Sequence, residues 1–578
     1  MAAPSPVQLA TSIPVFTITA GGQPLVSTIQ VVSIDVWTGV NKLPKVRLVV
    51  SDGSAADETF PISETAALIP GALLTVALGY GASQTPVFSG VIYRQGLDVT
   101  NNGPSRLVVE ATDQAMVMTL ARQNAIFQNV TDSQVCTQLI SGAGLTPAVT
   151  ATTTTHEAIV QYYATGWDLL VIRAQASGMA VTVDNGTVTV TPPSTSGSPV
   201  LTLTYGQSIL DFQADMDAST QFTPSAIQSF AWNPATQALA TSGSASASVS
   251  TPGNLSSATL AAVFNVATYT QQSAGALQTA ELTQWSSAEL LKTQLAKIRG
   301  KVRFQGSALV TPGTMVTLAG LGDRFNGNAY VSGVHHCLSE GLWRTTAEIG
   351  LSPAWFAAVA PNVPAPGASG QLPPIANLQT GIVKQIDQDP DGEFRVLVTL
   401  PLLQAAGGLG IWARFGAFYA SNGVGVNFYP EIGDEAVVAF MNGDPRYPVY
   451  LGSLYSKMKP PPFPPQTPNN IKSIMSKSKM HIDFVENTQE INIITPANQS
   501  VRINDSANSI VLTDANGNTV TMNASGVTIN SASDIKLTAT GSITLSAQNA
   551  LSATGTASVK INSTGAVQIK GATVALNP

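Results

Sequence analysis

The sequence predicts a mainly β protein that ends in a triangular prism shared by three chains. Three observations lead to this fold class: an eight-residue repeat at the C-terminus, two proline-rich breaks, and strand-forming runs with few helical segments before the repeat. The chain has 578 residues, a length that suggests about three to five domains.

The C-terminal repeat, residues 525–578, places one apolar doublet in every eight residues. Residues two apart point to the same face of a strand, so each repeat offers its doublet to one side. The other six positions are mostly Ser, Thr, Ala, Asn and Gly, which suit turns and a solvated face. The doublets are Val527 and Ile529, Ile535 and Leu537, Ile543 and Leu545, Leu551 and Ala553, Val559 and Ile561, and Val567 and Ile569.

An isolated repeat of this kind cannot fold. Burying two aliphatic side chains contributes roughly 3 to 6 kcal/mol, whereas ordering eight residues costs about 12 kcal/mol. Stacked partners must supply the rest, either as successive coils of one chain or as three chains that each form one face of a prism. Six repeats give one chain only about two coils, too few for a solenoid. The trimer is therefore favoured, with the doublets as its core.

A less regular series of doublets precedes the strict repeat. It runs from Ile482 and Phe484 to Val520 and Met522, at spacings of nine or ten residues. One interpretation is a short antiparallel sheet of hairpins, which the Asn516-Gly517 pair would favour. The other is the start of the same prism, and the continuity of the doublets favours it.

The proline-rich breaks divide the chain into three blocks, because proline cannot continue a helix or a strand ladder. The predicted segments are a first block at 1–360 with a flexible polar insert at about 234–257, a linker at 361–375, a second block at 376–457, a linker at 458–470, and the prism at 471–578.

The first block combines strands with a few helices. The predicted strands are Val46–Val50, Leu73–Leu78, Val87–Val91 and Arg106–Ala111, with a turn at Gly79–Gly81. One helix is expected to start at Asp132 as N-cap and to end at Gly142 or Gly144. A second runs from Trp167 to Ala176 before Gly178, and a third covers Thr279–Ile298.

The second block reads as a small closed β-barrel. Gly381–Ile386 and Phe394–Leu400 form a hairpin around Asp389–Gly392. Closure would remove strand edges that would otherwise be exposed. The further predicted strands are Ile411–Phe415, Val424–Phe428, Glu435–Phe440 and Val449–Leu451.

Composition excludes several classes of protein. Charged residues make up only 11% of the chain and its net charge is −7, which is unlike the basic surface of a nucleic-acid binder. The first 22 residues lack the features of a signal peptide, so synthesis in the bacterial cytoplasm is expected. Cys136 and Cys337 are too few for a disulfide framework.

The segment from Phe428 to Gly452 resembles the OB-fold signature of VgrG-type spike proteins of contractile injection systems and of phage baseplate spikes. Its motif residues are Pro430, Glu431, Gly433, Asp434, Asn442, Gly443, Asp444 and Pro445. The segments 113–120, 127–133, 161–170, 176–179, 310–313, 327–336 and 343–346 look like the hub domain of the same family.

This resemblance implies a homotrimer in which hub domains of β-barrel-like parts dock on the ring of an inner tube, either Hcp-like or a tail tube initiator. The OB-fold barrels would form a neck and the C-terminal strips a triple-stranded, intertwined β-helix. The other implied partners are baseplate proteins, cargo effectors and a target membrane that is pierced transiently. After assembly, the spike would leave the cell or enter a target cell when the machine contracts. A PAAR-type tip protein would contact Gly571, Ala572, Thr573, Val574, Ala575, Leu576, Asn577 and Pro578.

Catalysis, cofactors and metals are not expected. The gap from Tyr455 to Ile482 is too short for an inserted enzyme domain. His335, His336 and Cys337 are adjacent in a predicted strand and alternate between its faces, so the three cannot easily share one ion, and their spacing matches no zinc template.

The acidic residues are likewise not expected to form a catalytic set. Glu431, Asp434 and Glu435 read as charges on the barrel rim, while Asp505 and Asp514 are expected at turns.

The leading hypothesis is a non-enzymatic trimeric spike. The alternative is a trimeric tailspike that binds or cleaves glycans, which predicts aromatic or paired acidic residues along the prism. Residues 525–578 contain no Trp, Tyr or Phe, and Asp534 is their one acid. The sequence does not distinguish type VI secretion, a phage tail and an extracellular injection particle.

Overall fold

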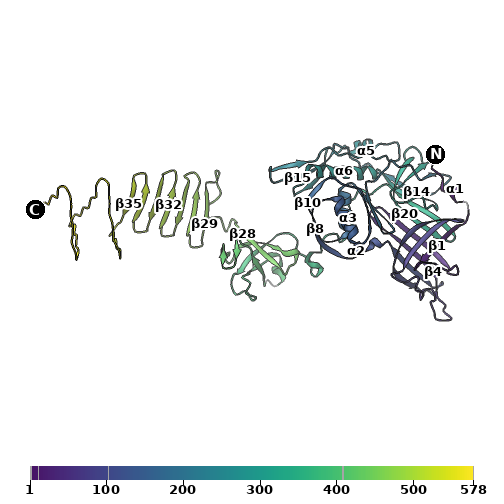
Figure 1. Cartoon of the computed structure of the whole chain (residues 1–578), viewed down its shortest axis with the longest axis horizontal. Coiled ribbons are helices and arrows are strands. Elements are labelled where there is room, and N and C mark those ends of the chain that lie inside the picture. Colours follow the sequence, from purple (N-terminus) through teal and green to yellow (C-terminus); the bar gives the residue numbers. More distant parts are fainter. Residues whose placement is uncertain (1–2, 11, 102, 407–408, 577–578) are drawn as a thin grey trace. The chain divides into compact units, whose positions relative to one another are not determined.

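The computed structural model describes residues 3–10, 12–101, 103–406 and 409–576. The chain is mainly β and divides into two compact units, Met1–Pro373 and Pro374–Pro578 (Figure 1). The first unit holds the helices α1 to α7, and the second unit holds the barrel and the C-terminal sheet.

One large sheet organises the first unit. Its strands follow the order β14-β18-β21-β20-β3-β4-β7-β6-β5-β1-β2, and β19 joins β20 and pairs with β13. The N-terminal strands are β1 (Pro14–Ala20), β2 (Gln23–Pro24), β3 (Val31–Gly39), β4 (Lys42–Ser51), β5 (Leu73–Tyr80), β6 (Ser83–Asp98) and β7 (Arg106–Thr112). The later strands are β13 (Leu201–Thr204), β14 (Ile209–Met216), β18 (Ile298–Gln305), β19 (Met315–Ala319), β20 (Gly327–Ser339) and β21 (Leu342–Ile349).

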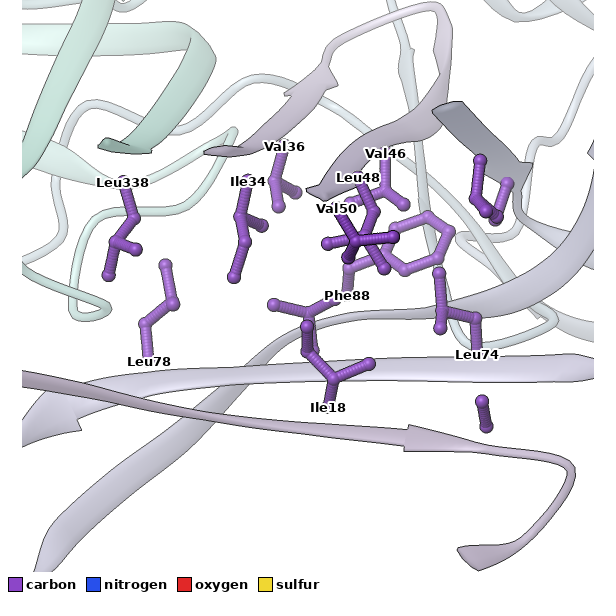
Figure 2. Close-up of a cluster of buried hydrophobic side chains, with 14 of the residues drawn as sticks. Ile18, Ile34, Val36, Val46, Leu48, Val50, Leu74, Leu78, Phe88 and Leu338 are labelled. Carbon is purple, nitrogen blue, oxygen red and sulfur yellow. The ribbon is translucent and has the colours of Figure 1, made fainter. Parts of the chain in front are cut away.

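Alternating apolar residues of β1 and β3–β7 build the N-terminal core of this sheet. Ile34, Leu48 and Leu74 are fully buried, and Figure 2 shows Ile34 and Leu48 side by side on the layer opposite the one that carries Leu74. Leu338 of β20 joins the same cluster. The four strands predicted between Val46 and Ala111 are confirmed, and each is longer than predicted. In β5 the strand pairing includes Gly79 and Tyr80, so the turn predicted at Gly79–Gly81 begins later than expected.

A second core lies under β13 and β18–β21. Phe304, Val316 and Val331 are fully buried there. Among the described residues, the N-terminal strands β1–β7 pair with these later strands only through β3 and β20, in which Ser33–Gly39 lie opposite Gly333–Ser339. This pairing is the seam between the two halves of the sheet.

Helices and small sheets cover a third core. Its elements are α2 (Val117–Leu120), β8 (Arg122–Thr131), α3 (Asp132–Gly142), β9 (Thr146–Val149), β10 (Thr155–Thr165), α4 (Gly166–Ala176), β11 (Ala180–Asp184) and β12 (Thr187–Thr191). The predicted helix N-cap at Asp132 is wrong by one residue, because the Thr131 side chain accepts the hydrogen bond from the Gln134 backbone N–H. Asp132 instead occupies the first turn.

The longest helix, α6 (Thr279–Leu295), packs against β15 (Ile227–Asn233). The helix is shorter than predicted, because Ile298 turns inward as the first residue of β18. The loop predicted at 234–257 differs from the structure at β16 (Ala238–Thr241), which pairs with β15. The remaining elements are α1 (Pro6–Leu9), α5 (Ser257–Phe264), β17 (Tyr269–Ser273) and α7 (Phe356–Val359).

The second unit begins with a closed five-stranded barrel. Its strands are β22 (Gln379–Gln385), β23 (Val396–Thr399), β24 (Ile411–Phe415), β27 (Glu435–Phe440) and β28 (Pro448–Leu454), in the order β22-β23-β24-β28-β27. The interior includes Val383, Val398, Ala413, Val438 and Tyr450. The predicted barrel is confirmed, but a barrel strand at Val424–Phe428 is wrong: β25 (Ala420–Ser421) and β26 (Val424–Gly425) make a separate hairpin.

A seven-stranded antiparallel sheet follows, and each strand pairs with the next in the chain. Within one chain the irregular doublets therefore form a sheet of hairpins, the less favoured of the two predicted arrangements. The strands are β29 (Ile471–Met475), β30 (His481–Val485), β31 (Glu490–Ile494), β32 (Ser500–Asn504), β33 (Ser509–Thr513), β34 (Thr519–Asn523) and β35 (Gly526–Asn530).

The strict repeat behaves differently from this sheet. Only its first doublet, Val527 and Ile529, lies in a strand, and residues 531–576 contain no strand. Each later doublet residue that is a large apolar side chain is at least half exposed. Among the described residues, no helix has both the length and the apolarity needed to cross a membrane.

Candidate functional site: an unpaired apolar face and the barrel motif

The doublets of the C-terminal sheet align into two apolar columns on one face. Because the register pairs each doublet with the next, the columns run unbroken across the strands. The first column is Ile482, Ile493, Val501, Leu512, Val520 and Ile529, and the second is Phe484, Ile491, Ile503, Ile510, Met522 and Val527.

The two faces of this sheet differ: polar side chains on one face find hydrogen-bond partners within the chain, whereas apolar side chains on the other face remain exposed. On the polar face, Ser473 donates to Asp483 at 2.6 Å and Asn492 donates to Glu490 at 2.7 Å. On the apolar face, the exposed fraction is 37% at Ile482 and 68% at Val527. Apolar side chains this regular and this exposed are typical of a surface that another chain covers.

The predicted core of the strict repeat has the same character. Ile543 is 52% exposed and Leu545 is 65% exposed, and both lie in extended chain without strand partners among the described residues. The other predicted core residues, Ile535, Leu537, Leu551, Val559, Ile561, Val567 and Ile569, have exposures between 50% and 69%. A trimer core would bury them, and one chain leaves them in water.

The barrel motif closes two turns. At the first, the Asp434 carboxylate accepts from the Glu431 N–H at 2.9 Å, while Gly433 donates to the Val383 carbonyl at 2.8 Å. Gly433 has φ 87, which favours glycine at this position. The turn thus ties β27 to β22. Pro430 is buried just before it.

The second turn follows β27. Asn442 and Gly443 have left-handed φ values of 50 and 68, and the Gly443 carbonyl accepts from Ile375 at 2.8 Å. The buried Asp444 accepts from the Arg446 guanidinium at 2.6 Å, which lowers the pKa of this carboxyl. Pro445 completes the turn. These residues shape the barrel.

Two of the three rim acids weighed as a catalytic set, Glu431 and Asp434, form ion pairs. Asp434 pairs with Lys459 at 2.7 Å, and Glu431 pairs with Lys477 at 2.7 Å. Asp514 caps the hairpin turn before β34, where its carboxylate accepts from the backbone N–H groups of Asn516 and Asn518.

A buried ionic network in the first unit was not predicted. Asp132 accepts from Arg173 and from Ser177, both at 2.6 Å. His156 lies 3.2 Å from Asp132 and 3.2 Å from Glu281 through its two ring nitrogens. Ser177 donates to the carboxylate, an arrangement that holds elements together and does not activate the hydroxyl. No local pattern indicates this network, since its members come from or adjoin α3, β10, α4 and α6.

His336 and its neighbours point to opposite faces of β20. His336 is buried, its Nδ1 lies 3.0 Å from Thr345 Oγ1, and burial lowers its pKa to about 3. His335 and Cys337 lie on the other face together with Asp35 of β3. Sequence reasoning missed Asp35, which is 300 residues away in the chain.

Comparison with known families identifies the larger unit first. Residues 10–340, more than half of the chain, match the family described as Alg8 N-terminal domain. The chain belongs to this family. In this Alg8-type chain, residues 379–455 match the type VI secretion system/phage-baseplate injector OB domain, and residues 490–549 match the phage baseplate V C-terminal trimerisation domain.

The Alg8-type chain is therefore a spike or baseplate-injector protein of the type VI secretion and phage kind. The VgrG-type resemblance predicted from the Phe428–Gly452 motif is confirmed, and the matched range includes the whole five-stranded barrel. No curated protein matches the chain.

Several solved structures are similar at low identity. A tail protein from Neisseria meningitidis is 14% identical, with 59% of this chain and 98% of that chain covered and a TM-score of 0.44. An Escherichia coli component of the type VI secretion system is 15% identical, with coverage of 76% and 99% and a TM-score of 0.37. The Francisella PdpA-VgrG complex, in its lidded form, is 8% identical, with coverage of 90% and 80% and a TM-score of 0.38.

Proposed function

We propose that this chain is a non-enzymatic homotrimeric spike that joins the inner tube and baseplate of a contractile injection machine to a membrane-piercing tip. The observation that carries the proposal is the pair of apolar columns on the C-terminal sheet. The match of residues 490–549 to a trimerisation domain supports it independently.

In the proposed trimer, each C-terminal sheet forms one wall of a triangular prism with its columns turned inward. Three identical apolar faces can bury one another completely in a closed prism. Two flat faces packed as a sandwich would leave the apolar residues along their edges exposed to water. Beyond Asn530, each chain would complete its hydrogen bonds with the other two chains, which accounts for extended segments that lack intrachain pairing. This part is the triple-stranded, intertwined β-helix expected from the sequence.

The remaining partners follow from the same assignment. The first unit would dock on an inner tube ring, Hcp-like or a tail tube initiator, and on baseplate proteins, with cargo effectors carried on the spike. A PAAR-type tip protein would cover residues 571–578, of which Val574 is 50% and Leu576 is 82% exposed. Asn577 and Pro578 lie outside the described residues. The protein would be made in the bacterial cytoplasm and leave the cell, or enter a target, on contraction.

The absence of catalysis is part of the proposal. Glu431 and Asp434 are paired with lysines, and Asp534 is the only acid of residues 525–578, so the strict repeat lacks the paired carboxylates of a glycosidase.

The test is the mass of the full-length protein in solution. A double substitution, Ile543→Asp with Leu545→Asp, places six charges in the proposed core of a trimer and should yield monomers by light scattering coupled to size exclusion. The matched control, Ser542→Asp with Thr544→Asp, adds the same charge at the alternate positions and should remain a trimer. Equal masses for both variants, or a monomeric wild type with a protease-resistant C-terminus, would contradict the proposal.

A further inference from the structure

Three side chains with metal-binding atoms meet at the seam of the large sheet. Asp35 comes from β3, and His335 and Cys337 come from β20. The register places Cys337 directly opposite Asp35 and His335 opposite Trp37. The ligand atoms of Asp35, His335 and Cys337 all lie within 4.8 Å of one another.

The geometry of this cluster is already close to what one ion requires. His335 Nε2 lies 2.9 Å from Asp35 Oδ1. In a tetrahedral zinc site, bond lengths of about 2.0 to 2.3 Å place ligand atoms roughly 3.3 to 3.7 Å apart. The three ligands sit on two paired strands, and their atoms would have to close from separations of up to 4.8 Å to this range.

The surroundings hold the ligands and leave them accessible. The Trp37 ring stacks on His335 with centroids 4.8 Å apart and an interplanar angle of 9°, which fixes the plane of the imidazole. The side chains of His335 and Asp35 are 33% and 18% exposed, so an ion can enter from solvent and a water molecule can take a fourth position.

Charged neighbours complete the site. Arg47 of β4 lies opposite Asp35, and Arg344 of β21 lies opposite Cys337. An arginine therefore flanks the cluster on each of the two neighbouring strands. Arg47 is exposed and Arg344 is half-buried, and long arginine side chains can turn toward water when a cation binds. Because the two guanidinium charges equal those of the carboxylate and the thiolate, binding of a divalent cation would require both arginine side chains to turn away from the ligands.

We propose that Asp35, His335 and Cys337 form a zinc site that cross-links β3 to β20. A donor set of one carboxylate oxygen, one imidazole nitrogen and one thiolate sulfur favours zinc over magnesium and calcium, which take oxygen ligands. The site would join strands 300 residues apart in the chain, at the seam where β3 pairs with β20. Its role is a clamp on the first unit, independent of the trimer contacts in the second.

Cobalt(II) titration of the untagged, metal-stripped full-length protein tests the site. We expect one equivalent per chain and a thiolate-to-cobalt charge-transfer band that zinc abolishes. Cys337→Ser should remove the band, and Asp35→Asn and His335→Gln should each weaken zinc binding at least 10-fold in calorimetry. The control Cys136→Ala removes the other cysteine, buried in α3, and should keep the band.

A second readout does not depend on the variants. Zinc should slow alkylation of Cys337 in the wild type by at least 10-fold, measured by mass spectrometry of the labelled peptides. A wild type that shows no charge-transfer band, or an alkylation rate of Cys337 that zinc leaves unchanged, would overturn the proposal.

Discussion

The buried network around His156 makes the stability of the first unit depend on pH. The side chain of His156 is only 7% exposed, and hydrogen bonds to Asp132 and Glu281 raise its pKa from 6.5 to about 9. A shift of this size corresponds to about 3 kcal/mol of stabilisation by the protonated ring, since a tenfold change in proton affinity is worth about 1.4 kcal/mol. This stabilisation is complete below pH 6.5 and is lost as the pH rises through 9.

Replacing His156 by Gln should remove that contribution. The buried thiol of Cys136 lies in α3 beside Asp132 and reports on local opening of this region, because burial raises its pKa to about 12 and keeps it unreactive. At pH 7, labelling of Cys136 in the variant should be about 100-fold faster than in the wild type, after correction for the intrinsic rate of an unfolded peptide. The difference should shrink as the pH rises past 9.

The control is Glu157→Gln, an exposed neighbour on the same strand, which should label like the wild type. A His156→Gln effect of the same size at pH 7 and pH 10 would show that the ring acts only by packing. Equal labelling of variant and wild type at pH 7 would refute the reasoning altogether.

Two further substitutions probe packing. Val438→Ala opens a cavity in the barrel interior and should lower the free energy of unfolding by about 2 kcal/mol, which hydrogen exchange would detect as faster exchange in β27. The control Val437→Ala, on the outer face of the same strand, should change exchange little. Equal effects of the two substitutions would mean that the barrel is not packed around Val438. Gly300→Ala would place a Cβ 2.1 Å from the Gln213 carbonyl oxygen and should cost roughly 1 to 3 kcal/mol, with faster exchange in β14 and β18. Gly96→Ala, which has open space, is its control, and a neutral Gly300→Ala would contradict the close strand approach.

Local patterns in the sequence were sufficient for much of the fold. The doublets from Ile482 to Met522 predicted a one-sided apolar surface, and the barrel strands around Val383 and Val438 were found because alternation along a strand is a local property. The motif from Phe428 to Gly452 pointed to the barrel family for the same reason, since its turns depend on neighbouring residues such as Gly433 and Asp444.

Long-range pairing could not be read in this way. Nothing near Asp35 indicates that it lies opposite Cys337, because strand order in a large sheet depends on the whole chain. The network of Asp132 and His156 was missed for the same reason. The strand predicted at Val424–Phe428 failed differently: its apolar residues are exposed in a short hairpin, and local propensity alone does not decide whether a strand joins a barrel.

The hairpin order of the C-terminal sheet has a consequence for biogenesis. Each strand from β29 to β35 finds its partner within a few residues, so this wall can form on a newly made chain before any sister chain is present. Residues 531–576 form no strand within one chain, and in the proposed trimer they would become ordered only after three such sheets have met. The proposed prism would then assemble in one direction, from the barrel toward the C-terminus. An incompletely assembled prism would be recognisable by an unpaired C-terminal segment.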